Sequence, residues 1–176
     1  MSYPALFALF VLFIAVQRLL ELRLAGRNER RVRAWGAVEY GAGHYPLIVA
    51  LHGLWLLGMV LEAFFGPRGF PAFAPLTFAL WLALQVARYW VIRSLGPYWN
   101  TRVLVVPGAR LVREGPFRFL KHPNYLIVTL ELALAPLTFG LYLTAALVTA
   151  LNALVMAMRI PVEERALATL GPAEEA

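Results

Sequence analysis

Long apolar stretches alternate with short polar ones along this chain, and the apolar stretches have the lengths of membrane-spanning helices. A helix needs about 20 apolar residues to cross the hydrocarbon core of a bilayer, which is about 30 Å thick. Residues 4–22, 45–65 and 76–92 meet or approach that length, and each is expected to form one span. Gln85 and Arg88 lie inside the third stretch and make it less purely apolar than the other two.

The remaining apolar segment runs from Asn124 to Met158 and contains no Lys or Arg over 35 residues. This is too long for one helix across the bilayer at a rise of about 1.5 Å per residue. Residues 135–140 contain a Pro and a Gly that break the segment. We therefore predict a helical hairpin with arms at residues 124–135 and 141–158. The fold class predicted is an all-α integral membrane protein with about five transmembrane helices.

The composition supports a single membrane domain over residues 1–176. Hydrophobic residues make up 61% of the chain, charged residues 15%, and the mean hydropathy is +0.67. A soluble domain is nearer half apolar and a quarter charged. The absence of Cys excludes disulfides and thiolate sites, and three scattered His with no Asp argue against a metal site. The net charge of +6 lies at the ends of apolar stretches, which favours contact with membrane lipid over nucleic-acid binding.

The distribution of basic residues predicts the orientation in the membrane. Lys and Arg number five, one, six, none and two after the successive predicted helices, and the single one is Arg68. Cytoplasmic connections carry the excess of basic residues, so the N-terminus is expected outside and the C-terminus inside the cell. The first apolar stretch has no basic region before it and no small-residue cleavage site after it. We expect it to be a retained span rather than a signal peptide.

Two polar segments stand out against this background, at residues 103–125 and 159–164. Arg159 and Glu163 are four residues apart and share one helix face. A solvated helix end would explain them, but Pro161 between them costs a backbone hydrogen bond, and Arg before Glu is the less favourable order. A basic, aromatic membrane-interface anchor would explain residues 115–125 equally well. Within that stretch, His122 or Asn124 is expected to cap the following helix.

Taken together, the two segments resemble the isoprenylcysteine carboxyl methyltransferase family of integral-membrane enzymes that use S-adenosylmethionine. The resemblance is carried by Gly-Pro-Phe-Arg at residues 115–118, Lys-His-Pro-Asn-Tyr at residues 121–125, Arg159 and the Glu pair at residues 163–164. It covers residues 95–170. It therefore implies a cofactor-binding and catalytic part there, with residues 1–94 as a three-span scaffold.

The resemblance also implies roles for individual residues. Glu163 would contact the cofactor from the last helix and Arg159 would face the acceptor group, so both are the expected catalytic residues. The pocket would open to the cytoplasm, and the acceptor would enter sideways between helices. The other expected cofactor-binding residues are Leu111, Val112, Phe117, His122, Pro123, Asn124 and Tyr125.

Two departures from the family pattern and the chemistry bear on the acceptor. Lys121 replaces the usual Arg, and Ile127 stands where many members have a small residue. We expect a carboxylate or an enolic or phenolic oxygen of a lipophilic small molecule, rather than a prenylated protein. Transfer of a methyl group from a sulfonium to an anionic oxygen cancels both charges, so a water-excluding pocket favours it and no general base is needed.

Some polar residues within the apolar stretches are further candidates. Charges inside a membrane are costly unless they are paired or line a site, so Glu131 and Arg88 are expected to approach each other or the acceptor tunnel. Asn152 lies seven residues before Arg159 on nearly the same helix face. It would either bind the acceptor or join helices, and Glu131 is a second expected acceptor contact. His44 and His52, in or near the second span, are expected to be interface or core histidines.

Two other functions fit the same pattern of spans. A phospholipid N-methyltransferase-like enzyme would place a neutral amine at the acceptor site, where Arg159 is a poor neighbour. A non-enzymatic membrane scaffold would use its charges only to set topology. It predicts that Arg159→Ala and Glu163→Ala leave every activity and ligand affinity unchanged.

Overall fold

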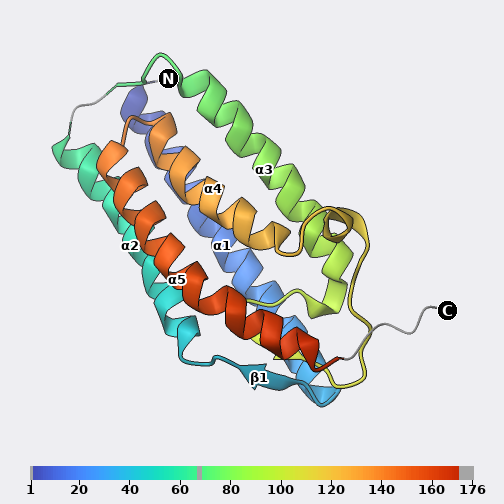
Figure 1. Cartoon of the computed structure of the whole chain (residues 1–176). Helices are drawn as coiled ribbons and strands as arrows, with labels where there is room; N and C mark the ends of the chain where they lie inside the picture. Colours follow the sequence, from blue (N-terminus) through green and yellow to red (C-terminus); the bar gives the residue numbers. More distant parts are fainter. Residues whose placement is uncertain (1, 67–68, 171–176) are drawn as a thin grey trace.

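The computed structural model describes residues 2–66 and 69–170, which include five long α-helices that run alternately in opposite directions (Figure 1). Two short strands and two 3₁₀ turns lie between them. In chain order the elements are α1 (Tyr3–Ala34), β1 (Val38–Tyr40), α2 (His44–Phe65), α3 (Ala74–Leu95), η1 (Gly96–Tyr98), β2 (Val103–Val105), η2 (Gly115–Arg118), α4 (Pro123–Thr138) and α5 (Tyr142–Ala168).

Four of the helices, α1, α2, α3 and α5, are long and apolar enough to cross a membrane. The first three predicted spans are thus confirmed as helices, although their ends differ. The first span was expected to end at residue 22, but residues 23–33 continue α1 to Ala34 because no Pro or Gly–Pro pair stops the helix. The fourth predicted helix is present as α4, but its 16 residues make it the shortest of the five. Arg68 lies outside the described residues.

The helices pack in the order α2, α5, α4, α3, with α1 lying behind α4 and α5 in Figure 1. Their shared core is aromatic and aliphatic: Phe10 of α1 packs 4.7 Å from the Trp81 ring of α3 and 5.0 Å from the Phe139 ring after α4. Trp55 of α2 and Leu132 of α4 are each only 1% exposed. Many of the large side chains exposed on the helices are apolar, as expected for contact with lipid.

The predicted hairpin between α4 and α5 is confirmed, and a distant side chain completes it. Gly140 has a φ of 71°, a conformation that lets the chain reverse after α4. The first amides of α5 then point at α2, where the carboxylate of Glu62 accepts hydrogen bonds from the amides of Leu143 at 2.9 Å and Thr144 at 2.7 Å. Glu62 therefore caps α5 from another helix and places a negative charge at its positive end.

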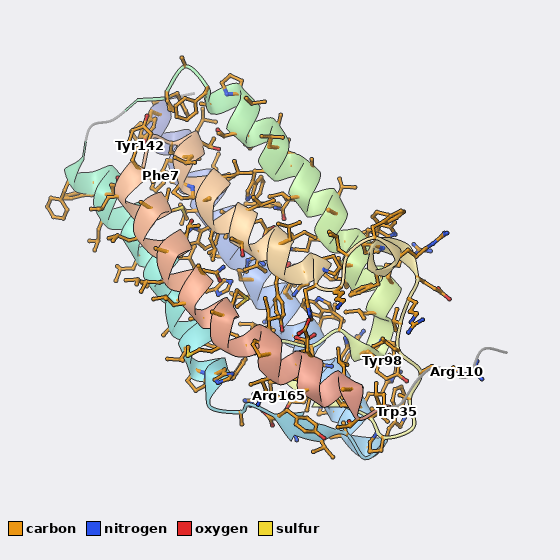
Figure 2. The ribbon with its side chains drawn as sticks, in the orientation of Figure 1. Phe7, Trp35, Tyr98, Arg110, Tyr142 and Arg165 are labelled. Atoms are coloured by element: carbon orange, nitrogen blue, oxygen red, sulfur yellow. The ribbon has the colours of Figure 1, made fainter. Side chains whose placement is uncertain are left out.

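The opposite end of the bundle holds the long connections, and we call it the loop end (residues 96–122 with β1). Figure 2 shows Trp35, Tyr98 and Arg110 there, far from Phe7 at the hairpin end. β1 and β2 pair antiparallel, with Glu39 opposite Leu104. This two-stranded sheet was not predicted, because three residues per strand are too few to show an alternating pattern. The side chain of Asn28 holds the start of the long connection through the carbonyl oxygens of Gly96 and Trp99.

Close packing explains the glycine that begins the Gly-Pro-Phe-Arg segment. Gly115 has a φ of 57°, and a Cβ there would lie 2.2 Å from the Ser94 hydroxyl of α3. Only glycine lets the connection approach α3 this closely.

The expected capping of α4 is wrong in detail: His122 occupies the N-cap position, but no side chain caps the helix. Pro123 instead begins α4, where the missing amide hydrogen is harmless.

Candidate active site

The two polar segments noted in the sequence meet at the loop end of the bundle. Nε of Arg159, near the end of α5, donates a hydrogen bond to the phenol oxygen of Tyr125, at the start of α4, over 2.8 Å. Nη2 of Arg159 donates to the backbone carbonyl of Thr101, also over 2.8 Å. The Tyr125 hydroxyl in turn donates to the carboxylate of Glu163. A hydroxyl can accept and donate at once, so one phenol links a cation to a carboxylate.

His122 extends this cluster toward the second glutamate. Its Nε2 lies 3.3 Å from Oε1 of Glu164, and its Nδ1 lies 3.9 Å from Oε1 of Glu163. The rings of His122 and Tyr125 are stacked with centroids 5.5 Å apart, which fixes both side chains relative to α4. The two segments therefore do meet, as expected, although the roles of their residues stay predictions.

Arg159 is only 4% exposed, so its charge must be balanced within the protein. Two oxygen acceptors satisfy Nε and Nη2, and the Glu163 carboxylate lies on the far side of the shared phenol. Nη1 has no hydrogen-bond partner among the described residues. The guanidinium therefore keeps one nitrogen available for a further oxygen.

A cavity of about 1220 Å³ extends from this cluster into the helix bundle. Single small-molecule pockets measure about 300–1,000 Å³, so this cavity has room for more than one ligand. Most of the predicted site residues line it, but Glu131 is not among the lining residues within the described part of the chain. Those that do are Leu111, Val112, Phe117, His122, Pro123, Asn124, Tyr125, Asn152, Arg159 and Glu163.

The two ends of the cavity differ in polarity. At the loop end, the connection through residues 98–113 and the start of α4 provide backbone and polar groups. The other end lies between α1 and α2, where most of the lining side chains are aliphatic. These include Ala15, Leu19, Leu22, Ile48, Val49 and Leu56. Such a division suits one polar ligand and one lipophilic ligand that meet near Arg159.

Four buried polar atoms of residues that line the cavity lack a partner among the described residues: Nε of Arg18, Nε1 of Trp99, Oδ1 of Asn124 and Oδ1 of Asn152. Buried polar atoms in proteins are nearly always hydrogen-bonded, so each marks a position that a bound molecule or water would complete. Nδ2 of Asn152 donates to the Thr129 hydroxyl of α4 at 2.8 Å. Asn152 therefore both joins two helices and lines the cavity, so the two expected roles do not exclude each other.

The expected approach of Arg88 and Glu131 is confirmed, as part of a larger buried cluster. Nε of Arg88 donates to Oε1 of Glu131 at 2.9 Å, and the two residues are 3% and 1% exposed. Arg18 of α1 reaches Glu131 at 3.0 Å and Glu21 at 2.6 Å, while Gln85 donates to Glu131 at 2.8 Å. Two cations and two anions thus balance between α1, α3 and α4.

The sequence did not lead us to predict Arg18 and Glu21 as members of this cluster, nor the Thr101 carbonyl as a partner of Arg159. Arg18 and Glu21 were detectable, because they are three residues apart at the end of the first apolar stretch. Thr101 was not detectable, since Arg159 contacts its backbone carbonyl and any residue type has one. Trp99 is a similar case, because only the folded connection brings its indole to the cavity.

A second ionic contact holds the outer connections together. Arg102 donates to Glu39 at 2.6 Å, lies 3.5 Å from Glu29 and stacks over the Tyr45 ring at 4.0 Å. Partial burial of the Glu39 carboxylate opposes its ionisation, but hydrogen bonds from Arg102 and Arg33 outweigh that effect and hold the pKa of Glu39 below its usual value. These contacts join β1, the end of α1 and the connection that carries Thr101.

A known protein family matches the part of the chain that contains this site. The model of the isoprenylcysteine carboxyl methyltransferase (ICMT) family matches residues 77–169, which is more than half of the chain and includes Tyr125, Arg159 and Glu163. The chain belongs to the ICMT family. This confirms the resemblance noted in the sequence. Together with the four long apolar helices, it establishes a multi-pass membrane protein from a family of membrane methyltransferases.

Two bacterial relatives match almost the whole chain of this ICMT-family protein. "Uncharacterized protein YpbQ" of Bacillus subtilis (strain 168) is 40% identical over 162 residues, covering 92% of this chain and 96% of the relative. An "Uncharacterized protein" of Haemophilus influenzae is 26% identical over 169 residues, covering 93% of this chain and 95% of the relative. The likeness therefore extends over α1 and α2, which lie outside the match to the family model.

Proposed function

We propose that this protein is an integral-membrane methyltransferase that transfers a methyl group from S-adenosylmethionine to an oxygen of a lipophilic acceptor. The acceptor oxygen is a carboxylate or an enolic or phenolic oxygen. One observation carries the proposal: Tyr125, Arg159 and Glu163 converge where the polar end of a large cavity meets its apolar end. Membership of the ICMT family supplies the reaction class.

The residues at the loop end fit this cofactor in charge and polarity. Glu163 and Glu164 offer carboxylates for an ammonium group, and His122 lies beside both. Asn124 offers an unpaired amide oxygen on the same wall. Leu111, Val112 and Phe117 line the cavity with apolar surface suited to an adenine ring. When bound, the cofactor supplies an electrophilic methyl group on a positively charged sulfur.

Arg159 is proposed to hold the acceptor oxygen. Its buried guanidinium has one nitrogen, Nη1, without a protein partner, and a charge-assisted hydrogen bond from it favours the ionised form of a carboxylate, enol or phenol. An ionised oxygen is already a nucleophile, so the protein has to position it and exclude water rather than remove its proton. Tyr125 and the Thr101 carbonyl orient the guanidinium for that task.

We further propose that α4 also crosses the membrane, because it packs between α3 and α5, which are both long and apolar enough to do so. Five spans place the basic loop end on the cytoplasmic side, with the N-terminus outside. A cofactor made in the cytoplasm would then enter at the loop end. The lipophilic acceptor would enter from the bilayer, where α1 and α2 border the apolar end of the cavity.

The test is binding of S-adenosylhomocysteine to the purified, detergent-solubilised protein, measured by calorimetry. We expect micromolar affinity that falls about tenfold or more in Glu163→Ala and His122→Ala, since each removes a charged or polar contact. Glu114→Ala is the matched control, because Glu114 is an exposed residue of the same connection and does not line the cavity.

Failure to bind in both detergent and lipid nanodiscs would overturn the proposal and favour a non-enzymatic scaffold. Binding with transfer to amines but not to acids or phenols would instead support a phospholipid N-methyltransferase-like enzyme. The unpaired guanidinium nitrogen of Arg159 argues against that outcome, because a cation repels a protonated amine and does not accept a hydrogen bond from a neutral one.

A further inference from the structure

We propose that the apolar end of the cavity contains a second polar subsite at His52, which binds a hydroxyl group on the lipophilic part of the acceptor. This inference rests on the proposed function, because it concerns the molecule that the cavity holds. It assigns a substrate class that the residues around Arg159 do not define: an amphiphile with one oxygen to be methylated and a second oxygen farther along its hydrocarbon part.

The hydrogen bonding of His52 leaves one ring nitrogen free. Nδ1 lies 2.9 Å from the carbonyl oxygen of Ile48, one turn earlier on α2. A carbonyl oxygen only accepts, so Nδ1 must carry the proton of this bond. In the neutral ring Nε2 then has a lone pair, and the hydrogen bonds of the described residues give it no partner. The residue lines the cavity, and Trp55 packs edge-on against its ring with centroids 6.3 Å apart.

The surroundings of His52 favour a neutral ring. The charged groups that act on it electrostatically are Arg18 of α1, Arg88 of α3 and Glu131 of α4. Burial among the aliphatic walls of the cavity disfavours a positive charge on the imidazole, and two of the three charged groups are cations that would repel it. These charged residues are hydrogen-bonded to one another and do not satisfy Nε2. Nε2 of His52 is thus an acceptor without a donor.

Helix packing places this acceptor well away from Arg159. α2 and α5 are antiparallel, with Gly58 against Thr144 and Gly41 against Val162. His52 lies between these two contacts, level with the middle of α5. Arg159 lies beside the contact of Gly41 with Val162. The two contacts place His52 opposite a position eight or nine residues before Arg159 on α5, which corresponds to about 12–14 Å along the helix. A ligand held at Arg159 therefore reaches His52 only with a part that is itself long.

A plain hydrocarbon chain would fill this region but would leave Nε2 without a hydrogen bond in a medium of low polarity. A hydroxyl can donate to Nε2 and, at the same time, accept from a guanidinium N–H such as those of Arg18 on the α1 side of the cavity. Sites built to pair with a hydroxyl discriminate strongly against the analogue that lacks it. His52 is accordingly a specificity residue for the acceptor rather than part of the reacting centre.

The experiment compares three acids as probes: octadecanoic acid, 2-hydroxyoctadecanoic acid and 12-hydroxyoctadecanoic acid. Each displaces a fluorescent fatty acid from the full-length protein in detergent with saturating S-adenosylhomocysteine. The variant His52→Phe keeps an aromatic ring but removes Nε2. The matched control is His44→Phe, because His44 begins the same helix and does not line the cavity among the described residues.

We expect the wild type and His44→Phe to bind the 12-hydroxy acid about 3- to 10-fold more tightly than octadecanoic acid, as one buried hydrogen bond predicts. The 2-hydroxy acid should show no such gain. His52→Phe should lose the gain and still bind octadecanoic acid about as well as the wild type. Equal affinities for the three acids in the wild type, or an undiminished gain in His52→Phe, would overturn the subsite.

The design separates this proposal from the proposed function. If S-adenosylhomocysteine binds but none of the acids does, the subsite is overturned and the methyltransferase proposal stands. If S-adenosylhomocysteine does not bind but the 12-hydroxy acid shows a gain that depends on His52, the proposed function fails and the hydroxyl subsite is retained. Transfer of a labelled methyl group from S-adenosylmethionine to the same acids then shows which bound acids are substrates.

Discussion

Arg159 donates a hydrogen bond from Nε to the phenol oxygen of Tyr125 across the junction of α5 and α4, at 2.8 Å. The same phenol donates to Glu163, and Nη2 of Arg159 is held by the Thr101 carbonyl. These contacts orient the guanidinium before any ligand arrives. Preorganised charge is the most effective way for a protein to stabilise an anion in a reaction, because no reorganisation is needed when the anion forms.

The first prediction separates the proposed role of Arg159 from cofactor binding. Arg159→Lys keeps the positive charge but cannot contact Tyr125 and Thr101 together, so an acceptor oxygen would be held poorly. We expect transfer of a labelled methyl group to dodecylphenol or octadecanoic acid to fall by about 10-fold or more, corresponding to the loss of about 1.4 kcal/mol. S-adenosylhomocysteine affinity should stay close to that of the wild type.

The control for this prediction is Arg165→Lys, which changes an exposed residue on the same helix whose Nε bonds only the Pro161 carbonyl. It should leave both readouts unchanged. An equal loss of S-adenosylhomocysteine binding and methyl transfer in Arg159→Lys would show that Arg159 serves the cofactor, not the acceptor.

The second prediction concerns the buried pair of Arg88 and Glu131. Glu131→Leu leaves the guanidiniums of Arg88 and Arg18 with one carboxylate, Glu21, in a region of low polarity. We expect a loss of about 3–5 kcal/mol in the free energy of unfolding. The double variant Arg88→Met with Glu131→Leu removes one charge of each sign and should recover a large part of that loss.

Unfolding of all four proteins in a double-mutant cycle, in one detergent, provides the measurement. Strictly additive effects of the two single changes would contradict the pairing, because residues in direct contact are expected to couple. A matched neutral change on the lipid-facing side of the same helix, Leu130→Ala, should cost less than either single variant, because Leu130 is 39% exposed.

The third prediction tests the cap at the hairpin end. Glu62→Ala removes the acceptor of the Leu143 and Thr144 amides, and should lower the free energy of unfolding by about 1–2 kcal/mol. Glu62→Gln keeps an oxygen acceptor without the charge and should cost less than Glu62→Ala. Thermal unfolding measures both. S-adenosylhomocysteine binding should be unaffected, because Glu62 lies at the opposite end from Glu163; a weakened ligand affinity would contradict this separation.

The fourth prediction is a pH dependence at the loop end. The pKa of Glu39 is lower in the folded protein than the value of 4.5 for the unfolded chain. The contacts of Glu39 with Arg33 and Arg102 therefore stabilise the fold above about pH 4.5, and that contribution is lost as the pH falls through the lower folded pKa. Because the pair is partly exposed, the effect should stay within about 1 kcal/mol.

The measurement is the midpoint of thermal unfolding for the wild type and Glu39→Gln between neutral and acidic pH. The wild type should be more stable at pH 7, and the difference should shrink as the pH falls below about 4.5. A difference that does not change with pH would mean that packing by the Glu39 side chain, and not its charge, stabilises the connection.

Much of this protein is determined by its sequence alone. The lengths of the apolar stretches require helices, because a backbone in lipid must satisfy its hydrogen bonds within each segment. The Pro and Gly of residues 135–140 determine the hairpin between α4 and α5. The spacing of Arg159 and Glu163, together with the residues at 115–125, was enough to point to the family, and most of the predicted site residues line the cavity.

Only the tertiary structure decided which groups meet across the helices. The pairing of Arg88 with Glu131 was expected, but the inclusion of Arg18 and Glu21 depended on α1 packing beside α3 and α4. Thr101 holds Arg159 through its backbone, and His52 reaches the cavity through the packing of α2 within the bundle. Periodicity along one chain reports which face of a helix is apolar. It does not report which partner that face will meet, because long-range packing and not local propensity selects the neighbour.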